Sequence, residues 1–195
     1  MRLLILPLLL LSLFSCSSTN SLDSESPIAK IEHTTVYFSD GKSASLPMSD
    51  ETTTVLYLVR HAEKAASGGS DPALTEEGIK RADRLRTILT NAGLTGVYST
   101  DYQRTRATAQ PSAEQADRFL QIYDPGNLAA FAEKIKVVEY PERFLIVGHS
   151  NTTPALVNTL LGEEKFAAID ESDYSNFFVM VINQNGEVVA RKLKF

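Results

Sequence analysis

Two short runs of apolar, β-prone residues limit most strongly what this chain can fold into. They are residues 55–59, Val-Leu-Tyr-Leu-Val, and residues 144–147, Phe-Leu-Ile-Val. Neither run alternates with polar residues, as a strand with one solvated face would. Continuous apolar runs are typical of strands buried on both faces, which occur mainly in parallel sheets covered by helices. The two runs therefore favour an α/β fold.

Helical and extended patterns alternate along the rest of the chain. Apolar residues at helical spacing predict a helix from Thr75 to about Ala92, with Thr75 as its cap. The other helices are expected to begin near Tyr102, with a kink or restart at Pro111, and to span 128–138 and 154–161. Further strands are expected at 96–99, 119–123, 177–182 and 188–193, the last two joined by the turn Asn185-Gly186.

This alternation predicts the fold class and the domain organisation. A three-layer α/β/α sandwich is expected, with a mostly parallel central sheet and a C-terminal antiparallel hairpin. One such domain accounts for residues 51–195. Residues 34–38 could add a short strand ahead of it.

The first segment of the chain has the form of an export signal. Arg2 precedes the apolar run 3–14, which is shorter than the roughly 20 residues that span a bilayer. The end of that run, up to Cys16, resembles a bacterial lipoprotein signal, in which the cysteine becomes the lipid-modified first residue. The alternative is an ordinary signal peptide with an incidental cysteine.

The lipoprotein interpretation divides the first 50 residues into two parts. Residues 1–15 are expected to be the signal peptide, and 16–50 to hold the lipidated Cys16, a tether to about residue 30 and the possible strand. The protein is then expected outside the cytoplasm, anchored to a bacterial membrane in the periplasm or at the cell surface.

Composition excludes several kinds of function. The single cysteine excludes an intramolecular disulfide and a cysteine-rich zinc site. The sequence has no dense cluster of histidines and acids with metal-ligand spacing, so no metal and no cofactor is expected. A formal net charge of −5 disfavours general attraction to nucleic acid or anionic lipid, so membrane contact is expected through the lipid anchor only.

Two of the three histidines directly follow the two buried runs. His61 comes after Arg60 at the end of the first run, and His149 comes after Gly148 at the end of the second. Because the carboxyl ends of parallel strands meet at one edge of a sheet, the two histidines are expected to approach each other. The third, His33, lacks such a context and is expected at the surface.

An arginine near the start of a helix points to an anion. Arg104 follows the strand at 96–99 and opens the next helix, where its charge opposes the helix dipole unless an anion lies between them. With Arg60 it could hold a phosphate, whose oxygens match guanidinium groups bidentately. Arg106, two residues further on, is expected to face elsewhere. The alternative is that Arg60 pairs with Glu63 and the histidines are ordinary loop residues.

Neutral imidazole gives this arrangement a chemical role. It is nucleophilic near pH 7 and can attack phosphorus to form a covalent phosphohistidine. Hydrolysis in two such steps does not require a metal-activated water.

Residues 58–63, Leu-Val-Arg-His-Ala-Glu, resemble the signature of the histidine phosphatase superfamily, which is phosphoglycerate mutase-like. Further matches lie at 74–78, 98–109 and 147–150, so the resemblance covers about residues 54–182. It implies an α/β sandwich in which His61 becomes phosphorylated. It also implies that Arg60, Arg104 and His149 complete the phosphate pocket.

The proton donor is where the chain departs from the resemblance. Many members have a glutamate after the third strand, which is missing here, and others have an aspartate after the second histidine, where this chain has Ser150. Asp124 is the best remaining candidate for the general acid. Glu63 and Asp173 are weaker ones. The compact size resembles the small bacterial phosphohistidine phosphatases, which also lack an obvious acid.

The expected function is metal-independent hydrolysis of phosphomonoesters or phosphoramidates through phospho-His61. The substrate would be a phosphorylated small molecule or a phosphohistidine. The alternatives are a phosphoglycerate mutase-like phosphotransferase and a phosphate-binding module with weak catalysis. Specificity is expected to come from the loops at 64–71, 123–128 and 163–176.

Overall fold

The structure, a computed structural model, describes residues 22, 24–50, 52–138 and 141–195. The predicted signal peptide and Cys16 lie outside the described residues. Within them, no helix is long and apolar enough to cross a membrane. The elements in chain order are β1 (Ile28–Glu32), β2 (Thr35–Phe38), β3 (Ser43–Ser45), β4 (Thr54–Arg60), α1 (Glu76–Ile88), β5 (Gly96–Ser99), α2 (Gln103–Gln115), β6 (Leu120–Ile122), α3 (Leu128–Lys136), β7 (Arg143–Gly148), α4 (Thr152–Leu161), β8 (Asn176–Ile182) and β9 (Val188–Lys194).

A six-stranded mixed sheet forms the centre of the molecule. Its strand order is β6-β5-β7-β4-β8-β9. The strands from β6 to β4 are parallel to one another, whereas β8 runs antiparallel to β4 and forms a hairpin with β9. The predicted parallel sheet and C-terminal hairpin are therefore confirmed.

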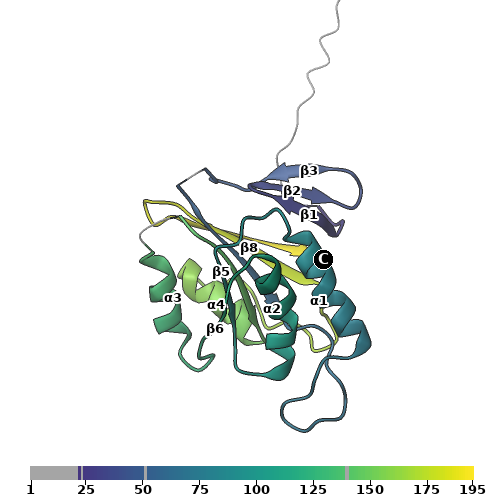
Figure 1. Cartoon of the computed structure of the whole chain (residues 1–195). Helices are drawn as coiled ribbons and strands as arrows, with labels where there is room; N and C mark the ends of the chain where they lie inside the picture. The colour runs from purple at the N-terminus through teal and green to yellow at the C-terminus, as the bar shows by residue number, and fades with distance from the viewer. Residues whose placement is uncertain (1–21, 23, 51, 139–140) are drawn as a thin grey trace, which may run out of the picture.

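Helices cover both faces of this sheet, as Figure 1 shows. Alternate residues of β4 divide between two apolar clusters because successive side chains of a strand point to opposite faces. Val55, Tyr57 and Val59 pack in the cluster that includes residues of α1 and α2. Leu56 and Leu58 pack in the cluster that includes residues of α3 and α4. The predicted three-layer sandwich follows from these two cores.

Two details of the helices differ from the sequence expectation. Ile79, one of the apolar residues whose helical spacing predicts α1, is exposed, and the neighbouring Gly78 is buried instead. A Cβ at Gly78 would lie 2.3 Å from the backbone oxygen of Glu63, so only glycine allows this close approach. Helix α2 also continues through Pro111 as one helix, so of the kink and the restart expected there, the restart does not occur.

The segment before the sandwich is more ordered than expected. The strand predicted at 34–38 is present as β2, but it is the middle strand of an antiparallel sheet with β1 and β3. This small sheet packs against α1, and its residues Ile31 and Val36 belong to the same buried cluster. Leu22 is also buried in that cluster. A tether extending to about residue 30 is therefore wrong, because the chain already contributes to the core before β1 begins.

The role of this small sheet can be tested with two matched substitutions. Ile31→Ala should lower the free energy of unfolding by about 2–5 kcal/mol, because it leaves a cavity in the core. Ile79→Ala, which truncates the same side chain on an exposed helix face, should change it by no more than about 0.5 kcal/mol. Urea unfolding followed by circular dichroism measures both. Equal, small effects would show that the small sheet is not part of the core.

Candidate active site

The pairing of β4 with β7 brings the two histidines together. Arg60 is in register with Gly148, and the backbone N–H of His61 donates to the Gly148 oxygen at 3.0 Å. The rings of His61 and His149 then face each other edge-on, with centroids 5.5 Å apart. A Cβ at Gly148 would lie 2.7 Å from the Tyr123 hydroxyl, so this junction has room only for glycine.

One contact decides which nitrogen of His61 can react. Its Nδ1 lies 2.8 Å from the backbone oxygen of Ala62. A carbonyl oxygen can only accept, so Nδ1 must carry the ring proton and donate it. In the neutral ring, Nε2 then holds the free electron pair. The backbone of Ala62 is itself fixed, because its N–H donates to the Thr108 hydroxyl at 2.9 Å.

A pair of threonines orients His149. The Thr105 hydroxyl donates to backbone oxygens, so its own oxygen is free to accept the proton of Thr100 at 3.0 Å. With that proton committed, Thr100 Oγ1 accepts from Nε2 of His149 at 2.9 Å. Neutral His149 therefore keeps its electron pair on Nδ1.

Both histidines are held neutral. Burial lowers the pKa of His61 to about 4, and the nearby Arg60 and Arg104 act in the same direction. Burial likewise lowers the pKa of His149 to about 4, again with help from Arg104 and Arg60. At neutral pH, His61 is therefore a nucleophile rather than a cation.

Arg104 projects from the first turn of α2, as the sequence predicts. The anion expected at this helix start is supplied within the protein by Asp71, whose Oδ1 accepts from the backbone N–H of Gln103 at 2.8 Å. The same oxygen lies 3.4 Å from Nη1 of Arg104. The guanidinium also stacks over the Tyr102 ring at 4.5 Å. Its buried Nε has no hydrogen-bond partner among the described residues.

Arg60 lies deeper, with 2% of its surface exposed. It does not pair with Glu63, which binds Arg81 instead. Its Nη1 donates to backbone oxygens of the α4–β8 loop, those of Asp170, Glu171 and Asp173, and its Nη2 contacts the Glu171 carboxylate at 2.7 Å. Like that of Arg104, its buried Nε lacks a partner within the described chain. Buried donors of this kind usually await a ligand or water.

An open cavity of about 440 Å³ lies over the histidines. Arg60 is not in its lining; it lies behind Glu171, which both lines the cavity and binds its guanidinium. Three of the four predicted pocket residues thus border the cavity directly. The lining residues are His61, Lys64, Tyr102, Arg104, Pro125, Gly126, His149, Ser150, Asn151, Thr152 and Glu171.

The structure does not bring the predicted general acid to this cavity. Asp124 is exposed, and its Oδ1 accepts from the backbone N–H of Gly126 at 2.8 Å within its own turn. The weaker candidates are also committed, Glu63 to Arg81 and Asp173 to Ser175. Neither of them lines the cavity.

Sequence reasoning missed Glu171, the only carboxylate in the described lining. Its Oε1 accepts a hydrogen bond from Ser150, the residue directly after His149. That hydrogen bond, more than any other cause, holds the pKa of Glu171 below its usual range. The only available signal was its position in the loop 163–176, which the sequence marks as a specificity surface.

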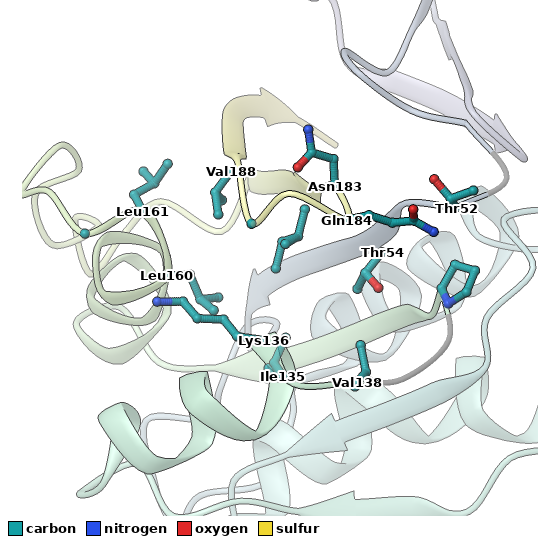
Figure 2. Close-up of a pocket in the computed structure, with 14 residues that line it drawn as sticks. Thr52, Thr54, Ile135, Lys136, Val138, Leu160, Leu161, Asn183, Gln184 and Val188 are labelled. Atoms are coloured by element: carbon teal, nitrogen blue, oxygen red, sulfur yellow. The ribbon is translucent and has the colours of Figure 1, made fainter.

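A larger cavity, of about 550 Å³, lies at the opposite end of the sheet. Figure 2 shows its lining, which comes from the start of β4, the ends of α3 and α4 and the β8–β9 turn. Lys136 is the only ionisable side chain among the described residues that line it. The described lining therefore has no acid, histidine or arginine, the side chains that the sequence predicts for phosphate binding and catalysis.

A model of the histidine phosphatase superfamily (branch 1) matches residues 56–128. This stretch contains the Arg60-His61 pair and Arg104. Over this stretch, which is less than half of the chain, the sequence is similar to the histidine phosphatase superfamily. Members of this superfamily are phosphatases or mutases that act on phosphorylated substrates.

Solved structures of similar fold agree with this architecture. The solved protein histidine phosphatase SixA, complexed with tungstate, superposes with a TM-score of 0.59 at 14% identity, covering 72% of this chain and 97% of that one. A phosphoserine phosphatase from Entamoeba histolytica gives 0.56 at 15% identity, covering 70% and 94%. The "probable phosphoglycerate mutase GpmB" of Yersinia pestis (strain Pestoides F) is 38% identical over 76 residues, 36% of this chain. The match spans only 35% of that curated relative.

The protonation of the two histidines can be followed by NMR. We expect the imidazole signals of His61 and His149 to titrate near pH 4 in the free protein, because burial opposes their charge. Saturating sulfate, a dianion throughout this range, should raise both pKa values. The His61→Ala and His149→Ala variants assign the signals. Titration near pH 6.5 without sulfate would contradict a buried, neutral pair.

The same shifts predict how stability depends on pH. The unfolded chain protonates these rings near pH 6.5, whereas the folded protein does so only near pH 4. Protonation therefore favours unfolding, and their contribution to stability should be lost as the pH falls from about 6.5 to 4.

Proposed function

We propose that this protein is a phosphatase that hydrolyses phosphomonoesters or phosphoramidates through a covalent phosphohistidine at His61, without a metal. The observation that carries this proposal is the state of His61. It is buried and neutral, its Nδ1–H is fixed by the Ala62 oxygen, and its Nε2 is free beside the cavity. A reactive nitrogen held this way needs no additional base to become nucleophilic.

The arginines and His149 supply the charge for binding the phosphoryl group. Arg104 borders the cavity, and its Nε has no partner among the described residues. Its guanidinium can therefore donate two hydrogen bonds to phosphate oxygens. A dianion would also favour protonation of His149, which would turn Nδ1 into a further donor. Arg60 can join them once its Nη2 exchanges Glu171 for a phosphate oxygen.

The reaction follows in two steps. Nε2 of His61 attacks phosphorus, the N–P bond forms, and the bond to the leaving group breaks. Water then attacks the phosphohistidine, the N–P bond breaks, and inorganic phosphate leaves. Positive charge fixed around the phosphoryl oxygens stabilises both transition states.

The cavity is open, which suits a substrate whose phosphoryl group is accessible from outside. At about 440 Å³ it admits a small phosphorylated molecule or a phosphohistidine side chain of another protein. The likeness in fold to a protein histidine phosphatase, over 97% of that compact chain, supports a phosphohistidine substrate.

A mutase reaction is the second candidate, because the curated relative is named a phosphoglycerate mutase. A mutase must retain the phosphoryl group and return it to the substrate. Product analysis with 3-phosphoglycerate separates the two: a hydrolase releases inorganic phosphate, and a mutase yields the 2-phospho isomer.

Replacement of the nucleophile tests the proposed function. His61→Ala should abolish turnover of p-nitrophenyl phosphate and covalent labelling by ³²P-phosphate donors, because it removes the attacking nitrogen. His33→Ala, which changes an exposed histidine of the β1–β3 sheet, should leave both unchanged. Label that persists in His61→Ala would exclude phospho-His61. A wild-type protein that binds phosphate without turnover would instead indicate a binding module.

We also propose that Cys16 carries a lipid that holds the protein outside the cytoplasm on a bacterial membrane. The proposal rests on the sequence of the export signal, in which Cys16 directly follows the apolar run. In a bacterial host, wild-type protein should incorporate radiolabelled fatty acid and sediment with membranes. Cys16→Ser should lose the label and the membrane association while its folded domain keeps its phosphatase activity. Unchanged labelling would overturn the assignment.

A further inference from the structure

Glu171 has a position that phosphate binding alone does not explain. It is the only carboxylate in the described lining of the cavity that holds His61 and His149. Phosphate would be repelled by an acid at this place. The other acids considered for catalysis, Asp124, Glu63 and Asp173, are bound elsewhere by their own partners.

Two contacts hold the Glu171 carboxylate beside the reacting groups. Oε1 accepts from the Ser150 hydroxyl, and Ser150 directly follows His149. Oε2 lies 2.7 Å from Nη2 of Arg60. The backbone oxygen of Glu171 also accepts from Nη1 of Arg60. This second contact keeps the loop bound to Arg60 when the Glu171 carboxylate leaves Nη2.

The direction of attack places Glu171 on the leaving-group side. His61 is buried at the floor of the cavity, with 3% of its surface exposed, whereas the Glu171 side chain is 70% exposed. In an in-line displacement the leaving group departs opposite the attacking nitrogen, which here means toward the mouth of the cavity. Glu171 is the carboxyl group at that mouth.

We propose that Glu171 is the catalytic acid and base of this reaction, a proposal that rests on the phosphatase function above. The bound phosphoryl group takes the place of Glu171 on Arg60, and the released carboxyl group lies beside a dianion, which favours its protonated form. As Nε2 of His61 bonds to phosphorus, Glu171 gives its proton to the departing oxygen or nitrogen. As water attacks phospho-His61, the Glu171 carboxylate takes the proton of the water, and Nε2 leaves with its electron pair.

Several charged groups act on Glu171 and bear on its pH dependence. Arg60 of β4, Lys64 of the following loop and His61 favour its ionised form, as does the Ser150 hydroxyl. Glu171 in turn raises the pKa of His149, because a carboxylate favours the protonated ring, so the two groups favour each other's ionised form. Asp170 and Asp173 lie in the same loop and are the acids closest to Glu171 along the chain.

The experiment compares leaving groups in the full-length protein and its Glu171→Gln variant. One substrate is p-nitrophenyl phosphate, whose leaving group needs little protonation, and the other is phosphoserine, whose leaving group needs a proton. The variant should lose about 10²-fold or more in kcat/KM for phosphoserine and less than about tenfold for p-nitrophenyl phosphate. Phospho-His61 should accumulate from p-nitrophenyl phosphate, because water loses its base. The alkaline limb of the wild-type pH profile should disappear.

Asp124→Asn is the matched control, since asparagine can keep the turn bond to Gly126. It should behave as wild type with both substrates. Two results for Glu171→Gln would overturn the proposal: an equal loss for both leaving groups, or higher activity with a lower KM, which would make Glu171 only a counter-ion of Arg60. A wild-type protein without turnover or labelling would overturn the phosphatase function itself, an outcome distinct from either of these.

Discussion

The parallel pairing of β4 with β7 is the interaction on which the rest of the site depends. It aligns Arg60 with Gly148 and places both histidines just beyond the paired ends. A slip by one residue would turn every side chain of a strand to the opposite face of the sheet. Both faces are covered by apolar helices, so such a slip would also bury Arg60 among apolar side chains. Core packing and site geometry thus specify the same register.

The site balances its own charges before any ligand binds. Arg104 is paired with Asp71 and Arg60 with Glu171, and the two acids come from two different loops. A buried guanidinium without a counter-ion is costly, so these internal acids let the fold keep two arginines close together. Under the proposed function, a phosphate dianion would exchange with these carboxylates rather than enter an uncompensated positive site. The overall negative charge of the protein is compatible with anion binding for this reason.

Much of the fold and part of the site could be predicted because they rest on local patterns. The apolar runs at 55–59 and 144–147 determine the central strands, and the rule for parallel sheets then places His61 and His149 together. The small sheet β1–β3 could not be predicted in the same way. Its strands have three to five residues, and its buried positions, such as Ile31 and Val36, are too few to show a period.

The acid in the site was beyond prediction for a different reason. Glu171 lies in a loop without periodicity, and its contact with Arg60 joins residues 111 positions apart. Nothing near either residue signals that contact. The sequence favoured Asp124 because it directly follows a strand. In the structure its carboxylate accepts from the backbone N–H of Gly126 within its own turn.

The buried Leu22 has a consequence for how far from a membrane the proposed active site could lie. Six peptide steps separate it from Cys16, and a fully extended chain covers about 20 Å over that length. If Cys16 is embedded in a lipid layer, the catalytic body stays within about its own diameter of the surface. Under the two proposals above, the protein would act on phosphorylated molecules at or near the membrane rather than throughout the compartment.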